Sequence, residues 1–215
     1  MPSPRRGSLF VISAPSGSGK TTLVKRLLRR TSELEFSISY TTRAVRGQEQ
    51  DGFDYHFISE GEFERRIAND EFLEWARVHG NYYGTSRKAT DSIRDAGRDV
   101  LLDVDVQGAE QVTTKEPDAI SLFVLPPSYE VLEQRLRGRK LDSDEVIRQR
   151  LIGARREVGH INRYDYVIIN DSLERASHEL ECIVRAARIR PHLLKERLAP
   201  IVRSFEELPE GDSSG

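Results

Sequence analysis

Residues Leu9 to Thr21 read Leu-Phe-Val-Ile-Ser-Ala-Pro-Ser-Gly-Ser-Gly-Lys-Thr, and this stretch decides the fold. An apolar run typical of a buried strand leads into a glycine-rich turn, and a helical pattern follows. A phosphate-binding loop requires this order of strand, tight turn and helix start. The general pattern G-x-x-x-x-G-K-[ST] expects glycine at Ala14 and matches at Gly19, Lys20 and Thr21. The flanking strand and helix disfavour the alternative, a turn that only caps a helix.

The residue types of this loop suit phosphate chemistry. Gly17 and Gly19 can adopt positive φ without a steric penalty, which lets successive N–H groups point inward around phosphate oxygens. The start of the helix adds the positive end of its dipole. We expect Lys20 to neutralise the terminal phosphates and the Thr21 hydroxyl to hold Mg²⁺. The stretch therefore predicts nucleotide binding, but not a reaction, through Ala14, Pro15, Ser16, Gly17, Ser18, Gly19, Lys20, Thr21 and Thr22.

Further apolar runs indicate an α/β fold. Runs that are typical of buried parallel strands lie at Val100–Val104, Ile120–Leu125 and Tyr166–Ile169. Apolar residues recur at helical spacing after Lys20 and again over residues 173–187, where Cys182 is expected to face the core. The fold class that follows is a P-loop NTPase core, in which helices flank a parallel β-sheet.

Two segments interrupt this alternation. Residues 36–87 are rich in Tyr, Phe, Thr, Gly and Arg and predict an inserted, strand-rich subdomain, a kind of insertion that usually carries specificity. Residues 135–156 hold eight basic residues against three acidic ones. A solvated basic helix face is the alternative to a functional role for these arginines.

A second phosphate site is indicated in residues 39–55. Arg43 and Arg46 lie three residues apart, with the hydroxyls of Ser39 and Tyr55 nearby in the sequence. Guanidinium groups bind phosphate bidentately, and hydroxyls can donate to its remaining oxygens. Residue types alone leave open that the two arginines are a solvated surface pair.

Three more polar residues follow in the same segment. Glu74 adds a carboxylate, Tyr83 a further phenol and Thr85 a hydroxyl. By residue type alone, Glu74 could equally be a charge at a helix end.

The composition excludes several classes of protein. The chain has 215 residues, and 33 Lys and Arg against 35 Asp and Glu give a net charge of −2, which disfavours a strongly basic nucleic-acid binder. Cys182 is the single cysteine, so neither an internal disulfide nor a multi-cysteine metal cluster can form. Apolar runs are far shorter than the roughly 20 residues of a membrane span. We expect a cytoplasmic protein with neither nucleic-acid nor membrane partners.

Six motifs in order resemble the guanylate kinase family. They are the loop at 14–21, Thr-Thr-Arg-x-x-Arg at 41–46, Glu-Phe-Leu-Glu-Trp at 71–75, Asn-Tyr-Tyr-Gly-Thr at 81–85, Asp-Val-Asp-Val-Gln-Gly at 103–108 and Ile-Ile-Asn-Asp at 168–171. The resemblance covers nearly the whole chain. It implies ATP-dependent phosphorylation of GMP, and of dGMP, with Mg²⁺ as the cofactor and ATP and GMP as the small-molecule partners.

The resemblance also implies a division of the chain. Residues 1–215 would form a single guanylate-kinase-like domain, with a P-loop core at 1–35 and 96–208. A GMP-binding subdomain would span 36–95 and a helical lid 135–156. A disordered tail is expected at 209–215.

Site residues follow from the resemblance, position by position. The implied GMP-phosphate contacts are Ser39, Arg43, Arg46, Tyr55 and Tyr83, and the implied guanine contacts are Glu74, Thr85 and Asp103. Arg135, Arg139 and Arg150 match the family's ATP-contacting lid arginines, and Asn170 matches a segment beside the adenine. The implied catalytic residues are Lys20, Arg43, Arg135, Arg139 and Arg150.

Family members differ at some of these positions. Thr85 stands where some members have serine, which keeps the hydroxyl, and alanine at the position of Ala14 also occurs in the family. The acceptor's own phosphate oxygen would be the nucleophile, so no general base is required. The five histidines are accordingly expected to be structural or surface residues.

Two other readings compete with this one. A related P-loop kinase that acts on another phosphorylated acceptor is disfavoured by Glu74, Thr85 and Asp103 beside the predicted phosphate clamp. A guanylate-kinase-like module that binds partner peptides is disfavoured by Gly19, Lys20 and Thr21 together with the lid arginines. The sequence leaves the oligomeric state open.

Overall fold

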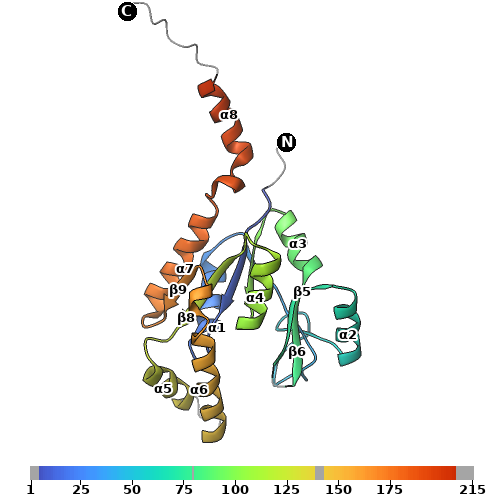
Figure 1. Ribbon diagram of the computed structural model, residues 1–215, viewed down its shortest axis with the longest axis vertical. Coiled ribbons are helices and arrows are strands. Elements are labelled where there is room, and N and C mark those ends of the chain that lie inside the picture. The colour runs from blue at the N-terminus through green and yellow to red at the C-terminus, as the bar shows by residue number, and fades with distance from the viewer. Residues whose placement is uncertain (1–4, 79, 139–142, 207–215) are drawn as a thin grey trace, which may run out of the picture.

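The computed structural model describes residues 5–78, 80–138 and 143–206 (Figure 1). Arg139 of the predicted lid and the tail predicted at 209–215 lie outside these residues.

Five strands of the described residues form a parallel sheet in the order β2-β7-β1-β8-β9. The strands are β1 (Leu9–Ser13), β2 (Leu34–Phe36), β7 (Asp99–Asp103), β8 (Ile120–Leu125) and β9 (Tyr166–Ile169). The predicted α/β fold with a parallel sheet is therefore confirmed. The strand predicted at 100–104 begins one residue earlier, because Asp99 pairs with Leu34 on β2.

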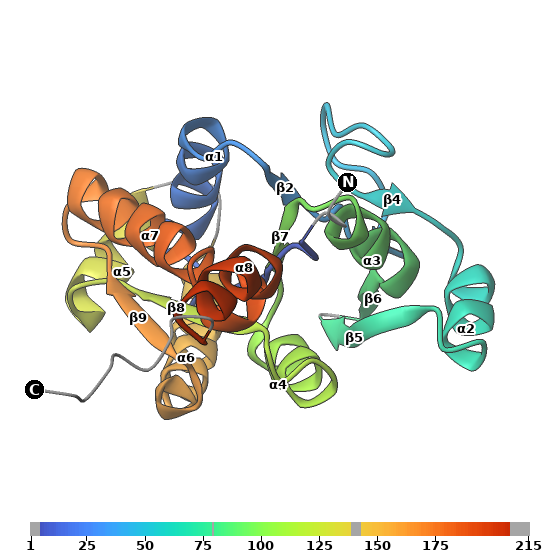
Figure 2. The same ribbon diagram turned by 90° about the horizontal axis from the view of Figure 1, so that it is seen from above.

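Alternating side chains of β1 build two cores, one on each face of the sheet. Phe10 and Ile12 pack with residues of α1 (Lys20–Arg30) and α7 (Leu173–Ala187). Leu9 and Val11 pack with residues of α4 (Val106–Lys115) on the opposite face. Figure 2 shows α1 and α7 on one side of the sheet and α4 on the other. Each fully buried large side chain stabilises the fold by about 1.5–3 kcal/mol.

The edge strand β9 and the helix α7 correct two expectations of burial. Tyr166, Val167 and Ile169 are exposed, because β9 follows β8 as the last strand in the order of the described sheet and so lies at its edge. Cys182 is exposed too and contacts His178, one turn earlier on α7. Leu180 and Val184 face the core instead, so Cys182 falls outside the buried stripe of this helix.

A second sheet lies beside the first and, in the described residues, has the strand order β4-β3-β6-β5. Its elements are β3 (Tyr40–Thr41), β4 (His56–Phe57), β5 (Phe72–Val78) and β6 (Asn81–Ser86). The β5–β6 and β3–β6 pairs are antiparallel, whereas β3 and β4 are parallel. The helix α2 (Glu60–Ala68) joins β4 to β5 within this sheet, and α3 (Arg87–Asp95) joins β6 to β7 of the first sheet.

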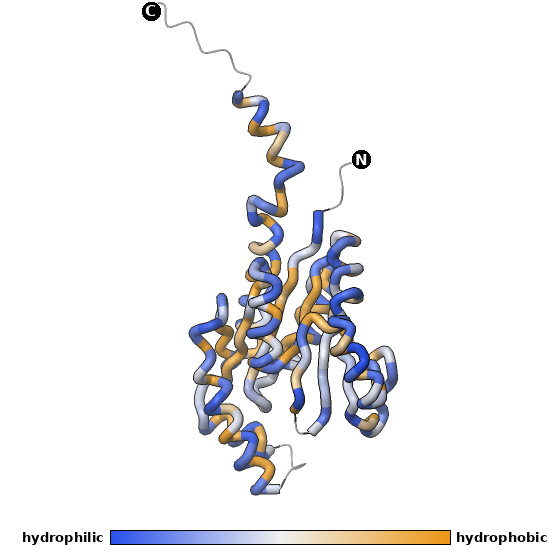
Figure 3. Tube along the Cα trace, turned by 45° about the vertical axis from the view of Figure 1, so that its right-hand side comes forward, coloured by the Kyte–Doolittle hydropathy of each residue, from blue (hydrophilic) through white to orange (hydrophobic). Residues whose placement is uncertain are grey.

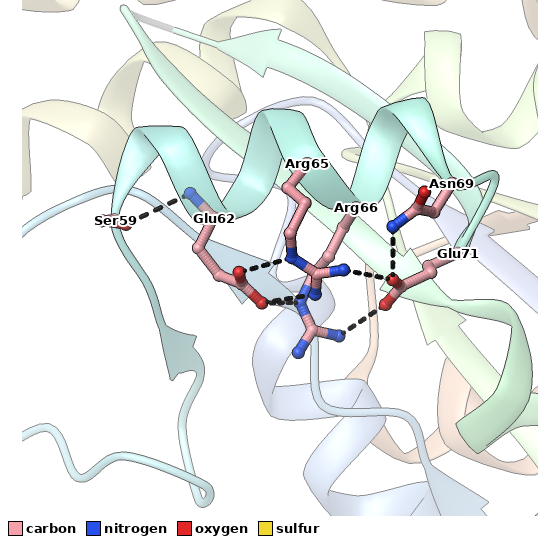
Figure 4. Close-up of polar contacts among 6 residues, drawn as sticks. All are labelled: Ser59, Glu62, Arg65, Arg66, Asn69 and Glu71. Carbon is pink, nitrogen blue, oxygen red and sulfur yellow. Dashed lines mark hydrogen bonds and ion pairs between the residues drawn. The ribbon is translucent and has the colours of Figure 1, made fainter.

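Polar contacts tie α2 to the start of β5 (Figure 4). The Ser59 side chain caps α2 by accepting a hydrogen bond from the Glu62 amide. Glu62 accepts hydrogen bonds of 2.8 Å from both Arg65 and Arg66, and the two arginines also reach Glu71 at 3.0 and 3.2 Å. Single exposed pairs contribute little to stability, but this network fixes the residue immediately before β5.

The connection back to the first sheet runs through α3. Ile93 packs against the core beneath α4, and the Arg94 side chain donates to the Gly7 carbonyl and pairs with Glu116. The helix α3 thus contacts the first sheet as well as the second. The predicted division at residues 36 and 95 stays a prediction.

Two helices of the predicted lid project from the first sheet at the lower end of Figure 1. They are α5 (Tyr129–Gly138) and α6 (Asp144–Val158). They share a small core of their own, formed by Leu132, Leu136, Ile147, Leu151 and Ala154. The two helices therefore pack on each other through a cluster that is separate from the two main cores.

The C-terminal part of the described chain extends away from the body. Short 3-10 turns at Ile161–Arg163 and Pro191–Leu193 precede β9 and α8 (Lys195–Glu206), respectively. Apolar and polar residues mix along α8, and Ile201, Val202 and Phe205 are exposed (Figure 3).

Among the described helices, none combines the length and apolarity that crossing a bilayer demands.

Candidate functional site

The predicted phosphate-binding loop joins β1 to α1. Gly17 and Gly19 both adopt positive φ, 95° and 93°, and the Ser18 amide donates to the Pro15 carbonyl. The N-terminal end of α1 carries no side-chain cap, so its first N–H groups stay available to an anion. The backbone therefore takes the conformation that the glycines predict.

Two predicted ATP-binding residues meet behind this loop, at the carbonyl of Ser18. The Asn170 side-chain amide donates to that carbonyl at 2.7 Å, and the Arg135 guanidinium donates to it at 3.2 Å. Arg135 also donates to the Asn170 carbonyl at 2.9 Å. A side chain at Gly19 would place Cβ 2.3 Å from the Asn170 amide nitrogen and would be strained at the φ of 93°, so a substitution here would disturb both the loop and its contact with Asn170.

Lys20 and Asp103 form an ion pair inside the site. Asp103 ends β7 and is the register partner of Ile12 on β1, while Lys20 opens the helix that follows β1. The carboxyl ends of neighbouring parallel strands thus bring together the predicted phosphate-binding lysine and a predicted guanine contact. Both side chains are about three-quarters buried, at 20% and 25% exposure.

The predicted phosphate clamp holds a carboxylate in the structure. Arg43 is buried and pairs bidentately with Glu49 through two contacts of 2.9 Å. The guanidinium also lies over the Tyr55 ring at 5.2 Å. The pair lowers the pKa of Glu49, chiefly through the hydrogen bond from Arg43, and the Arg46 amide assists. The Arg46 side chain is exposed.

A cavity of about 190 Å³ opens between the two sheets. Its lining includes Ala14, Lys20, Ser39, Tyr55, Glu74, Tyr83, Asp103 and Asp105. The rings of Tyr55 and Tyr83 meet edge to face with centroids 6.0 Å apart. Burial raises the pKa of Tyr55, so its phenol stays protonated and can donate. Residues predicted to bind ATP and residues predicted to bind GMP therefore line the same cavity.

Glu74 is the most deeply buried carboxylate of this cavity, with 4% exposure. It lies opposite Thr85 in the β5–β6 ladder and accepts a hydrogen bond of 2.6 Å from the Thr85 hydroxyl. Burial raises the pKa of Glu74 to about 7, and the Thr85 hydrogen bond opposes this rise. The structure thereby places Glu74 on a strand, not at a helix end.

Both lid helices bring charged side chains toward the site. Arg135 on α5 contacts the loop, as described above, and Arg150 is half-buried on α6. Glu157 on α6 lies close enough to Lys20 and Asp105 to sense their charges, and burial raises its pKa. Arg139 lies outside the described residues.

Three carboxylates near the site, Glu49, Asp105 and Glu157, were not among the predicted site residues. Glu49 follows Arg43 by six residues and Arg46 by three. This closeness in sequence to two arginines could have predicted the ion pair with Arg43. Glu157 sits among basic residues of α6, and nothing in the local pattern of that helix marks it as facing Lys20.

Larger cavities lie elsewhere in the molecule. One of about 930 Å³ forms where the N-terminal segment meets the residues after α7, and one of about 560 Å³ lies between β9 and α7. Of the predicted site residues that the structure describes, none lines either of them. The smaller cavity between the sheets is the candidate site, because the polar residues that fit one chemistry converge there.

Comparisons with known proteins agree with this geometry. A sequence model of the guanylate kinase family matches residues 6–187. The guanylate kinase of Nitrosospira multiformis is 53% identical over 184 residues, which cover 86% of this chain and 88% of that protein. The guanylate kinase of Chromohalobacter salexigens is 47% identical over 202 residues, 94% of each chain.

A solved structure is similar over the same extent. The crystal structure of guanylate kinase from Anaplasma phagocytophilum superposes with a TM-score of 0.74 at 35% identity, covering 90% of this chain and 94% of that one. The phosphate-binding loop, the second sheet and the sequence relationship lead to the same conclusion: the chain belongs to the guanylate kinase family.

Proposed function

We propose that the protein transfers the γ-phosphoryl group of ATP to GMP, and to dGMP, giving ADP and GDP. One observation carries the proposal: a buried carboxylate on the second sheet, Glu74, and the lysine of the phosphate-binding loop, Lys20, line one cavity. A carboxylate that can bind a base and a lysine that can bind phosphate groups, lining one cavity, suit two nucleotides that bind with their phosphates facing each other.

Glu74 and Thr85 explain a preference for guanine. The base-pairing edge of guanine presents adjacent N1–H and N2–H donors beside the O6 acceptor. The Glu74 carboxylate can accept from both donors, while the Thr85 hydroxyl can turn from Glu74 toward O6. Adenine would set an acceptor at N1 against the carboxylate, and a buried site of this kind rejects such a mismatch strongly.

The phosphate group of the acceptor nucleotide would bind in the predicted phosphate clamp. Arg43 and Arg46 supply guanidinium groups, and Ser39, Tyr55 and Tyr83 supply hydroxyls. Glu49 occupies the Arg43 fork, so an incoming phosphate would compete with this carboxylate or share its guanidinium. A dianionic phosphate is the stronger partner for a buried guanidinium.

The loop, Lys20 and the lid arginines would stabilise the transferred phosphoryl group. Its transition state is loose, with charge spread over the equatorial oxygens, so catalysis is mostly positioning and charge stabilisation. Lys20 would leave Asp103 for the phosphates of ATP. Arg135, Arg139 and Arg150 would add positive charge from the lid and exclude water that would otherwise hydrolyse ATP.

The residues beside the loop fit a magnesium ion. Thr21 is exposed in the first turn of α1, while Asp103 at the end of β7 and Asp105 at the start of α4 add carboxylate oxygens. An all-oxygen donor set suits Mg²⁺, which usually keeps several waters and binds substrate phosphates. We assign Thr21 as its protein ligand; the ion would neutralise charge on the β- and γ-phosphates.

The test is turnover with Mg-ATP against GMP, dGMP, AMP, CMP and UMP, measured as ADP release. We expect turnover with GMP and dGMP and little with the other acceptors. ADP release with no preference for guanine nucleotides would overturn the proposal.

Two other expectations from the sequence, the cellular location and the absence of a nucleic-acid partner, remain predictions. The cytoplasmic location rests on the single cysteine and the short apolar runs of the sequence. That nucleic acid is not a partner rests on the near-zero net charge.

A further inference from the structure

The outer edge of β5 is covered by side chains of a helix in place of a strand. β5 is the last strand in the order of the second sheet and pairs along one edge with β6. Its other edge faces α4, the helix that packs on one face of the first sheet. An edge strand exposes a row of N–H and C=O groups that need partners.

Gln111 on α4 pairs with the backbone of β5 at one residue. Its side-chain amide donates to the Trp75 carbonyl at 2.7 Å, and its side-chain carbonyl accepts from the Trp75 amide at 3.2 Å. This two-point contact has the donor and acceptor pattern of a neighbouring strand. Gln111 thereby holds the backbone immediately after Glu74.

Lys115, one helical turn later on α4, holds the backbone immediately before Glu74. Its ammonium group donates to the Leu73 carbonyl at 2.8 Å. The β5–β6 register shifts at this point, since Phe72 pairs with Ser86 and Glu74 with Thr85, so Leu73 is the extra residue of a bulge. Bulges re-aim neighbouring side chains, and this one sets the direction of Glu74.

The same face of α4 leaves room for the carboxylate itself. Gly108, Gln111 and Lys115 are spaced three and four residues apart, so they share one face of the helix. A side chain at Gly108 would place Cβ 2.6 Å from a Glu74 carboxylate oxygen. The Leu73 side chain is 2% exposed and packs in the core that α4 covers. This face of α4 is therefore shaped around Glu74 and both of its neighbours.

We propose that Gln111 and Lys115 are positioning residues that hold Glu74 in register with the base of the acceptor nucleotide. The inference rests on the proposed function. A carboxylate that must meet two donors of a flat base edge tolerates little rotation of its strand, and a loose edge strand would misalign it. The two residues act through the backbone of Leu73 and Trp75 and do not touch the nucleotide.

The experiment uses variants of similar size in the full chain. Gln111→Met and Lys115→Met remove the donors and keep the side-chain volume. Lys115→Arg restores a charged donor. Thr114→Val is the matched control, because Thr114 is exposed on the same helix and its hydroxyl donates to the Glu110 carbonyl of that helix. KM and kcat are measured with GMP varied, with ATP varied, and with AMP in place of GMP.

We expect each Met variant to raise KM for GMP about tenfold, the effect of one lost hydrogen bond of full strength, while KM for ATP stays within twofold. The ratio of kcat/KM for GMP over AMP falls by a similar factor. Lys115→Arg recovers most of the loss, and Thr114→Val behaves like the wild type.

Two results would overturn the proposal. Melting temperatures that fall while KM for GMP and the GMP/AMP ratio stay at wild-type values would show that the contacts only hold α4 on β5. Equal rises in KM for GMP and for ATP would show a general distortion. A wild-type enzyme with no GMP-dependent release of ADP would instead reject the proposed function itself.

Discussion

The hydroxyl of Thr85 donates a hydrogen bond of 2.6 Å to the carboxylate of Glu74, from the facing position on the neighbouring strand. Glu74 is nearly inaccessible to solvent, and an unpaired carboxylate there would be costly. The β5–β6 ladder thus aligns a hydroxyl donor and a carboxylate acceptor side by side, as the proposed recognition of guanine requires.

Replacing Glu74 by glutamine tests this base recognition. Glu74→Gln keeps the shape and loses one acceptor, so it should cost GMP about 1–3 kcal/mol in transition-state binding. The ratio of kcat/KM for GMP over AMP should fall, and steady-state kinetics with both acceptors measure it. An unchanged ratio would remove Glu74 from the base site. Glu133→Gln, in an exposed ion pair on α5, is the control.

The raised pKa of Glu74 predicts a pH dependence of stability. Its pKa lies at about 7 in the folded protein against an ordinary value of 4.5, so between these values the folded state binds more protons than the unfolded chain. The free energy of unfolding therefore falls as pH rises through this window, by roughly 3 kcal/mol at most.

Glu74→Gln lacks this titration. In urea titrations at pH 5 and pH 8, the stability of the variant relative to the wild type should rise with pH. Parallel stabilities at the two pH values would contradict the buried, proton-binding carboxylate.

Removal of the Lys20 ammonium group tests the phosphate-binding loop. Lys20→Ala should lower kcat by about 10²–10³, the scale of losing one preorganised charge stabiliser. Lys25→Ala, which changes an exposed residue on the same helix, serves as the control. Activity of Lys20→Ala within tenfold of the wild type would reject the assigned role.

The contact between Asn170 and Ser18 predicts an effect on ATP. Asn170→Ala removes a buried donor from the Ser18 carbonyl and leaves Arg135 as its side-chain partner. We expect KM for ATP to rise about fivefold to tenfold, with KM for GMP near the wild-type value. Initial rates with each substrate varied separate the two constants. Asp171→Ala changes the exposed next residue as a control, and equal effects of both variants would argue against a specific role for Asn170.

Much of the first sheet was predictable because its signals are local. The strands at 9–13, 120–125 and 166–169 have the predicted bounds, since runs of apolar residues bounded by turn residues mark buried strands. Periodicity predicted helices after Lys20 and over 173–187, which α1 and α7 confirm. The same signals could not show that β9 lies at the edge, because strand order depends on which segments pair.

The exposure of Cys182 shows a limit of periodicity. The residue lies within one turn of Leu180 and Val184, both buried, yet it points to solvent. A wide apolar stripe read from sequence does not reveal where the packed face of a helix ends, because the neighbouring elements set that limit.

The sequence by itself determined the loop chemistry of this protein. Gly17, Gly19, Lys20 and Thr21 lie within one short stretch of the chain. Their backbone preferences and charges act at that place in any fold that keeps the strand and helix around them. A local conformation encoded by adjacent residues needs no distant contact to be recognised.

Only the tertiary structure decided which groups pair within the site. Asp103 contacts Lys20, and Gln111 and Lys115 hold the backbone on either side of Glu74, so these contacts join residues from separate elements. Glu49 pairs with Arg43 within the loop between β3 and β4, whose folding brings the two side chains together. Residue type left Glu74 as either a base reader or a charge at a helix end. Glu74 lies on a strand, and its burial and its hydrogen bond with Thr85 support the proposed contact with the base. Both features arise only when the sheets and α4 pack together.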